Sequence, residues 1–579
     1  MIQLRDIMIV LGAGALMCGC SESFLDHLPD ERTEIDTEDK VVQLMIGAYP
    51  DANYQWVAEI NTDNLIDNQA PHLPSNPNDK QILSYYNYSA YDRADDELFR
   101  FDPAESAKYS DYDAPGQIWS GYYNTIAYCN FALEAVEKIT AEKGTMSAKL
   151  KAARAEALLL RAYCHFMLVN IFSQAYKDET QSKKDIGVPY VTAPETTVSV
   201  DYDRGNVYDT YQKIQADLEA GLADITDENY TAPKWHFNVN AAHAFAARFY
   251  LFTRQWDKVV THADQVLGTD NTTLKNMMMD YSVFTDCSSS SDYANAWQDP
   301  DLNNNLMLLT TGSLYQRRCF GYRYSMAGPA AREALMIHSS NLWSGYICTP
   351  IAIVSGMLFS SSSADYGFFS CKMAEQFEYT NKIAGIGYPH IIVRAFTANN
   401  LLLERAEAKI MLKDYTGAQD DLMAYWNNSL ESFSEADTKA YVETGYIKRL
   451  TPTNMKTYYS NASNPNCFSS WDFVSQNVSS EYVIPEEATH YMNCLNDFRR
   501  FENACEGLRY FDMKRWGLEM SHDVGVETVT YTLDANDSRR AIEVPWEAMS
   551  AGLESSRSQV AAGARMTLTM PSDEDLRVK

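Results

Sequence analysis

The stretch EGLRYFDMKRW, residues 506–516, says more about the fold than any other part of the sequence. Four of its charged residues recur at intervals of three: Glu506, Arg509, Asp512 and Arg515. A helix places residues at this spacing along one face. Carboxylates and guanidiniums arranged in this way form either a catalytic cluster or a salt-bridged structural seam, and the spacing alone leaves both interpretations open.

Segments with helical periodicity lead up to this stretch. Aromatic and apolar residues recur every three or four positions from Trp119 to Ile139, and Gly144 interrupts that pattern. Similar patterns predict further helices over about 149–176, 203–225, 240–267, 391–411 and 415–426. The chain is therefore expected to be mainly α.

Two of these helical blocks resemble each other. The same intervals of nine, three and four separate Ala247, Trp256, Val259 and Ala263 in the first block and Ala406, Tyr415, Ala418 and Leu422 in the second. Small residues at such positions let two helices approach closely. We interpret the blocks as degenerate tetratricopeptide-like repeats. Stacked helix pairs of this kind form a scaffold with a continuous core and extended surfaces.

The composition changes between about residues 269 and 381. The runs Ser288–Ser291 and Ser360–Ser363, with many Gly and Asn residues around them, predict a loop-rich insertion. Few and short strands are expected, one of them at Thr528–Leu533, where side chains alternate. The resulting division is a leader over 1–19, a helical region over 20–268, the insertion over 269–381 and a C-terminal region over 382–579.

The N-terminus has the pattern of a lipoprotein signal peptide. Arg5 precedes the apolar run Ile7–Met17, which is too short to span a bilayer, and Cys18, Gly19 and Cys20 end it. Cys20 is then the acylated first residue of the mature protein, which would be held on a membrane by lipid. An ordinary secretory signal with two incidental cysteines is the alternative.

Charge and motifs exclude several classes of function. The chain has 48 basic and 78 acidic residues, and a net charge of −30 argues against nucleic-acid binding. It contains no HExxH, GxSxG or phosphate-binding glycine-loop motif, so we expect no enzyme activity and no cofactor. Alternating oxygens at Asp299, Asp301, Asn303 and Asn305 resemble part of a calcium loop, but its glycine and glutamate are missing, so we expect no metal site there.

Several segments, in order along the chain, resemble the SusD/RagB family. They are Cys20–Asp26 with Pro29, Trp119-x-x-Tyr122 with Ile126 and Asn130, Arg161–Tyr163, Gly187–Pro189, Val207–Leu218, Leu401–Ala408, Glu506–Trp516 and Ile542–Pro545 with Glu547. The chain departs from the family pattern in Tyr510, where Trp is usual, and in the late asparagine-proline-glycine turn, which is not evident. The resemblance covers nearly the whole chain.

The resemblance implies a fold, a location and partners. Members of the family are helix-rich, surface-exposed lipoproteins of the outer membrane. They lie as lids on SusC-like TonB-dependent transporters and bind glycans or, in some branches, peptides. The resemblance also makes the 506–516 segment architectural and not catalytic. We therefore expect a non-catalytic lipoprotein that captures oligosaccharide and delivers it to such a transporter, with peptide capture as the alternative.

Two regions are expected to contact the ligand, one before the first long helix and one in the insertion. Sugars stack on flat aromatic rings, and nearby Asn, Asp or Arg side chains bind their hydroxyls. The candidates with these properties are Asp67, Asn68, Tyr85, Tyr86, Tyr88, Tyr91, Arg93, Trp297, Tyr315, Arg317, Tyr322, Tyr324, Trp343 and Tyr346. Packing within loops is the competing interpretation for each. A surface glycoside hydrolase and a pure protein scaffold are the other functions considered.

Overall fold

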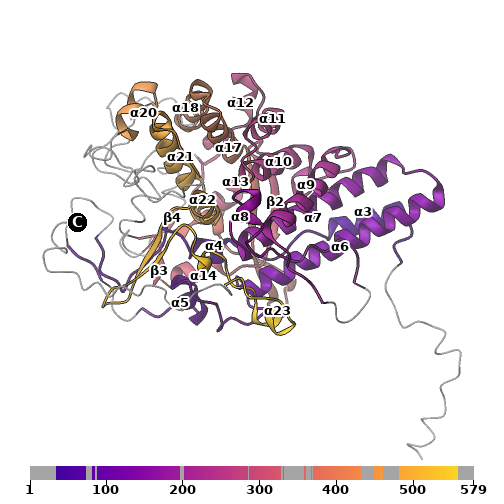
Figure 1. Cartoon of the computed structure of the whole chain (residues 1–579), viewed down its shortest axis with the longest axis horizontal. Helices are drawn as coiled ribbons and strands as arrows, with labels where there is room; N and C mark the ends of the chain where they lie inside the picture. The colour runs from indigo at the N-terminus through magenta and orange to yellow at the C-terminus, as the bar shows by residue number, and fades with distance from the viewer. Residues whose placement is uncertain are drawn as a thin grey trace, which may run out of the picture.

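A computed structural model of the chain describes residues 34–557 apart from the ranges 74–80, 85–87, 196–200, 328–329, 331–357, 360–366, 432–448 and 461–481 and the single residues 285, 322 and 368. Helices dominate the regular structure of this part of the chain, and its strands form small antiparallel sheets (Figure 1). The prediction of a mainly α protein with few short strands is confirmed.

The two longest helices lie side by side and carry much of the core (Figure 1). They are α6, Pro115–Lys143, and α7, Ala148–Phe172, where the sequence predicted helices. Gly144 ends α6 with a φ of +74°, a left-handed conformation that favours glycine. Every residue of α7 from Ala155 onward is buried. Among the described helices α7 is the one long and apolar enough to cross a membrane, but it is enclosed by protein, so we assign it to the core.

The predicted helix pairs are present. The first pair is α10, Val239–Phe252, and α11, Trp256–Leu267; the second is α17, Ala398–Met411, and α18, Tyr415–Glu431. Ala247, Ala263, Ala406 and Ala418 are fully buried where the paired helices meet. The connecting turns also match, since Arg254 and Lys413 adopt left-handed φ angles of +59° and +63° at equivalent positions. The tetratricopeptide-like interpretation is confirmed.

The segment before α17 corrects one prediction. Residues 391–397 were expected to begin a helix, but they belong to strand β7, Ile386–Thr397, and the helix begins only at Ala398. The β-branched run Ile391-Ile392-Val393 favours a strand, and the Thr397 side chain caps α17 by accepting a hydrogen bond from Asn400 N. β7 pairs with β2, Asn305–Thr311, and with the edge strand β6, Gln376–Asn381.

The predicted insertion contains more regular structure than expected. Its described part includes α12, Asn271–Met277; η2, Tyr281–Phe284; α13, Ser290–Trp297; β2; α14, Tyr315–Phe320; β3, Tyr324–Ser325; β4, Leu358–Phe359; β5, Phe369–Ser370; η3, Cys371–Met373; and β6. β2 is almost wholly buried, which its Ser- and Asn-rich surroundings did not indicate. The boundaries 20–268, 269–381 and 382–579 stay predictions.

The segment 506–516 lies at the centre of the fold as α22, Leu508–Trp516. Arg515 donates hydrogen bonds of 2.5 and 2.6 Å to both carboxylate oxygens of Glu407 on α17. Arg499 on α21, Thr489–Glu502, pairs with Asp512 at 2.8 Å. Burial would raise the pKa of Asp512, but the guanidiniums of Arg499 and Arg515 hold it below its usual value. The charged face is therefore a buried structural seam, as the resemblance implied.

Gly507 is required where this seam meets the N-terminal region. Its φ is +73°, and a Cβ there would lie 3.0 Å from the Gln55 Cα on α4, Gln55–Glu59. Glu59 accepts hydrogen bonds from the backbone nitrogens of Cys505 and Gly507, and Arg509 pairs with Asp63 at 2.9 Å. Residues nearly 450 positions apart in sequence thus form one core.

The remaining elements complete the molecule. They are α3, Glu38–Ile46; β1, Ile66–Asp67; α5, Arg93–Phe99; α8, Glu179–Ser182; α9, Val207–Leu222; η1, Pro233–Trp235; α20, Pro452–Tyr459; η4, Glu486–Ala488; β8, Met520–Val524; β9, Val529–Leu533; η5, Ser538–Arg540; and α23, Trp546–Ser550. The strand predicted at 528–533 is confirmed as β9, which pairs with β8.

Candidate functional site

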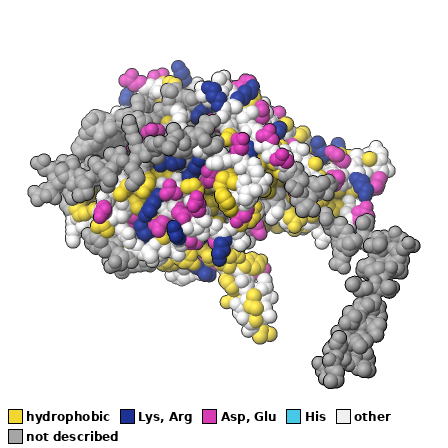
Figure 2. Space-filling view, turned by 60° about the horizontal axis from the view of Figure 1, so that its bottom comes forward, with side chains coloured by type: hydrophobic (Ala, Val, Ile, Leu, Met, Phe, Trp, Pro, Cys, Tyr) yellow, Lys and Arg dark blue, Asp and Glu magenta, His cyan; other side chains and the backbone are white. Residues whose placement is uncertain are grey.

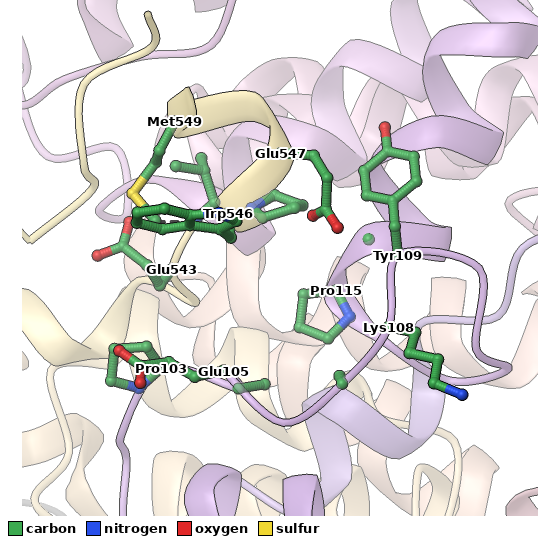
Figure 3. A pocket seen from close by; sticks show the side chains of 14 residues that line it. Pro103, Glu105, Lys108, Tyr109, Pro115, Glu543, Trp546, Glu547 and Met549 are labelled. Carbon is green, nitrogen blue, oxygen red and sulfur yellow. Dashed lines mark hydrogen bonds between the residues drawn. The ribbon is translucent and has the colours of Figure 1, made fainter. Parts of the chain in front are cut away.

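A groove of about 590 Å³ lies between α23 and the loop that leads into α6 (Figure 3). Its lining combines flat, apolar and charged side chains. The lining residues are Pro103, Ala104, Glu105, Ala107, Lys108, Tyr109, Pro115, Gly116, Glu543, Val544, Pro545, Trp546, Glu547 and Met549. Segments more than 400 positions apart in sequence form its two walls.

One wall presents an exposed indole ring. Trp546 is the first residue of α23 and is 72% exposed, the most open tryptophan of the described residues. The segment before it is fixed, because Ile542 N donates a 3.0 Å hydrogen bond to Ile171 O at the end of α7. Glu543 accepts hydrogen bonds from Val544 N, Ser555 Oγ and Ser556 N, which holds it in place. The indole is thus presented to solvent from a rigid base.

The other wall depends on close packing at the start of α6. Pro115 occupies the first turn of α6, where the missing N–H costs nothing. A Cβ at Gly116 would lie 2.6 Å from the Tyr109 Cα and 2.7 Å from the Tyr109 carbonyl oxygen. Only glycine therefore lets the 103–109 loop lie against the helix. This contact sets the position of Tyr109 opposite α23.

The side chains between the walls have the chemistry of a polyol site. Figure 3 shows the Glu547 carboxylate pointing into the space between Trp546 and Tyr109. Burial raises the pKa of the Tyr109 hydroxyl, the Ser120 hydrogen bond lowers it and nearby Glu547 raises it further, with a net rise. The hydroxyl therefore keeps its proton at neutral pH and is able to donate or accept a hydrogen bond. A flat ring beside such groups fits the apolar face and the hydroxyl rim of a sugar.

Comparisons with known proteins relate the chain to the SusD-like family. A family model described as SusD-like, "starch-binding associating with outer membrane", matches residues 23–251. A SusD superfamily protein from Bacteroides vulgatus has 17% sequence identity and a TM-score of 0.55, covering 90% of this chain and 99% of that chain. SusD superfamily proteins from Bacteroides thetaiotaomicron and Bacteroides fragilis have 16% and 14% identity and TM-scores of 0.51 and 0.53, each covering 90% of this chain and 99% of the other. No curated protein matches the chain.

Residues 23–251 thus resemble the SusD-like family, and the chain shares the fold of solved SusD superfamily proteins. The resemblance noted in the sequence is thereby confirmed, and at such low identities the solved structures show the shared fold alone. The Trp546 groove lies where the loop before α6 meets the C-terminal segment around α23.

Several of the predicted ligand-binding residues are buried in the core of the protein. Trp297, Tyr315 and Tyr324 are at most 3% exposed. The Arg394 guanidinium covers the Trp297 ring at 3.7 Å, Tyr315 packs edge-on against Trp56, and Tyr324 stacks on Phe99. In this arrangement these rings contact protein and offer no face to a ligand.

Asp67 and Asn68 have structural partners as well. Asp67 is 1% exposed and lies within 3.4 Å of Arg323, and it accepts hydrogen bonds from the backbone of Gln69 and Gly525. Asn68 Nδ2 donates to Ser325 Oγ at 2.8 Å. Both residues thus hold the early loop against the segment around β3, and Asp67 also binds the C-terminal loop at Gly525.

Other predicted residues do reach the surface. Tyr91 is 46% exposed, and the side chains of Arg93 and Arg317 are 82% and 47% exposed. Arg317 pairs with Glu375 through two hydrogen bonds of 2.5 and 2.7 Å. Tyr88 is half-buried, and its carbonyl accepts a hydrogen bond from Gln69. Cys20, Tyr85, Tyr86, Tyr322, Trp343 and Tyr346 lie outside the described residues.

The suspected calcium-loop fragment forms an ordinary turn. Asp299 Oδ1 accepts a hydrogen bond from Asp301 N, and the amides of Asn303 and Asn305 donate to backbone carbonyls. Among the described residues no group of three or more His, Cys, Asp and Glu side chains is placed to hold a metal ion.

The Trp546 groove is not among the ligand sites that the sequence predicts. The sequence Glu543-Val544-Pro545-Trp546-Glu547 contained a usable signal, because a tryptophan between two carboxylates just after a proline is poorly suited to a core. Its pairing with the 103–116 loop is a long-range contact that no local pattern reveals.

Figure 2 shows basic and acidic side chains interspersed over one face of the molecule, with hydrophobic groups between them.

Proposed function

We propose that this protein is a non-catalytic carbohydrate-binding protein that captures its ligand in the Trp546 groove. The main support for this proposal is the exposure of the Trp546 ring. An indole that is 72% open contributes little to folding. It lies at a groove that Pro103, Pro115 and Met549 also line, and a concave apolar surface with a few polar groups is the usual form of a ligand site. The carboxylate of Glu547 and the hydroxyl of Tyr109 lie beside it as partners for sugar hydroxyls.

Binding without turnover fits the carboxylates of the groove. A glycoside hydrolase needs a general acid in a desolvated setting that keeps its proton, together with a second carboxylate across the scissile bond. Glu105 and Glu547 are exposed to solvent. Glu543 is 8% exposed, but its oxygens are occupied by three hydrogen-bond donors. This distribution favours hydrogen bonding to a sugar over acid catalysis.

The location and the partner form the second part of the proposal. The predicted leader over 1–19 and acylation at Cys20 would anchor the protein in the outer membrane, facing the cell exterior. The match to a family described as starch-binding and associating with the outer membrane supports this location. A SusC-like TonB-dependent transporter would receive the oligosaccharide from the groove, and the helical scaffold would pack on its rim. Peptide capture is the alternative for the same role.

Glycan binding and turnover are tested together. The purified protein is titrated with a panel of neutral oligosaccharides and with peptides, and each mixture is analysed for products. We expect binding of a glycan that is recovered intact. Released sugars would indicate a glycoside hydrolase, and peptide binding alone would favour peptides as the ligand. If the protein binds neither glycans nor peptides, the proposal is wrong and a pure protein scaffold is the function that remains.

The partner is tested on the native protein. Purification from its own outer membrane in mild detergent, followed by mass spectrometry, is expected to recover lipid on Cys20 and a TonB-dependent barrel in similar amount. An unlipidated protein recovered alone would contradict the transporter-lid role.

A further inference from the structure

Two histidines face each other across the first helix pair, outside the Trp546 groove. His243 on α10 and His262 on α11 approach with their Nδ1 atoms 3.0 Å apart, and their ring centroids are 5.2 Å apart. Each ring is partly exposed to solvent. In a hydrogen bond between two imidazoles one nitrogen donates its proton and the other accepts it through a lone pair. The pair therefore shares a single proton between its Nδ1 atoms.

The helices hold the two rings at a fixed separation. His243 lies one turn before Ala247 and His262 lies next to Ala263, and both alanines are fully buried where α10 packs on α11. The Tyr250 ring stacks on the His262 ring, with centroids 5.4 Å apart and the planes at 14°. The two imidazoles thus meet on a rigid support.

The surroundings keep both imidazoles neutral at neutral pH. Burial lowers the pKa of His243. Burial, the neighbouring His243 and the charge of Lys258 lower the pKa of His262 to about 4, and Glu219 opposes this shift. Lys258 lies 3.5 Å from Glu219, whose carboxylate also accepts a 2.8 Å hydrogen bond from the Tyr250 hydroxyl. Neutral imidazole is the form that binds metal ions, so protons compete little for this pair at neutral pH.

The spacing of the two nitrogens is close to that of a metal site. Zinc binds imidazole nitrogens at about 2.0–2.1 Å, so two ligands of a tetrahedral ion lie about 3.3 Å apart. The Nδ1 atoms, now 3.0 Å apart, would separate by about 0.3 Å to take such an ion between them. The partial exposure of both rings gives water access to the remaining coordination positions. Imidazole ligands suit zinc, copper and nickel, whereas calcium and magnesium take oxygen ligands.

We infer that His243 and His262 form a two-histidine site for a divalent transition metal ion of the zinc or copper class, with water completing the coordination. The imidazole that donates in the hydrogen bond moves its proton to Nε2, so both Nδ1 lone pairs bind the ion and no proton is lost overall. The ion replaces one hydrogen bond by two coordinate bonds and joins α10 to α11. This inference is independent of the proposed glycan binding.

Zinc titration of the untagged protein tests this site. Zinc chloride is titrated calorimetrically into the wild type, His243→Asn, His262→Asn and His490→Asn. Excess calcium chloride is present to occupy the carboxylates of this acidic chain, since calcium leaves imidazoles free. His490 is the matched control, because it is a partly exposed histidine on α21 whose ring packs on Tyr491. Melting temperatures without added metal check the fold of all four proteins.

We expect one zinc ion per wild-type chain and the same affinity in His490→Asn. Changes around a metal ligand already cost about 10–100-fold in affinity, so the loss of one of two ligands should cost about 100-fold in His243→Asn and in His262→Asn. Copper(II) bound to the wild type should give the electron paramagnetic resonance signature of two imidazole nitrogens, a measurement that needs no variant.

Three results would overturn the inference. They are a wild type that binds no zinc, a zinc affinity that the His243 and His262 variants keep or that His490→Asn loses equally, and a copper spectrum without coupling to nitrogen.

Discussion

Replacing Trp546 by alanine tests the groove with little risk to the fold. Trp546 is 72% exposed, so truncation removes few contacts within the protein, and surface substitutions of this kind usually change stability by about 0.5 kcal/mol or less. A tryptophan presents about 250 Å² in all, so about 180 Å² is open here and a sugar on one face covers about half of that. At about 25 cal/mol per Å² the lost contact amounts to about 2 kcal/mol, or about thirtyfold in Kd.

The assay is calorimetric titration of the tightest-binding oligosaccharide into the wild type, Trp546→Ala and Tyr128→Ala. Tyr128→Ala removes a comparably exposed aromatic ring and should bind as the wild type does. Thermal melts verify that all three proteins are folded. Binding by Trp546→Ala within twofold of the wild type would refute the assignment of the groove. An equal loss in Tyr128→Ala would show that the effect is not specific to it.

Three further changes test the core and the walls of the groove. Glu407→Ala removes the buried carboxylate that pairs with Arg515 and should lower the free energy of unfolding in urea by about 3–5 kcal/mol. A loss below about 1 kcal/mol would contradict a structural role for this buried ion pair. Burial raises the pKa of Glu59 from 4.5 to about 7, so its contribution to stability is complete below pH 4.5 and is lost as the pH rises through 7, by about 3 kcal/mol. The free energy of unfolding of Glu59→Gln, measured with denaturant, should fall less between pH 4.5 and 7 than that of the wild type. An equal fall in both proteins would contradict the raised pKa of Glu59. Gly116→Ala should displace the Tyr109 loop and weaken glycan binding, whereas Gly47→Ala, whose nearest neighbour would be 3.9 Å away, should not; equal binding by both would contradict the packing argument.

The sequence predicts the helices well because their determinants are local. The spacing within Trp119–Ile139 and the repeat of Ala247 and Ala406 follow from helical periodicity, and the structure reproduces them down to the turns at Arg254 and Lys413. The segment 391–397 was wrongly predicted as helical because an apolar run fits a buried strand equally well. Only its pairing with β2, more than 80 residues earlier, decides between them.

The candidate site was less predictable, because exposure is a tertiary property. Trp297 and Tyr315 lie among Ser, Asn and Gly residues, which suggested a surface loop, yet Arg394 and Trp56 cover them. Trp546 was overlooked because its neighbours in sequence did not show that the 103–116 loop would face it. Arg317 lies at the surface, but its role in ligand binding stays a prediction, and its pairing with Glu375 depends on the fold.

A crystal structure of the protein with its tightest-binding oligosaccharide tests the central claim most directly. The account predicts an intact glycan with one sugar ring against the Trp546 indole and hydroxyls within hydrogen-bonding distance of Glu547 and Tyr109. A glycan bound elsewhere, with the Trp546 ring uncovered, would contradict it.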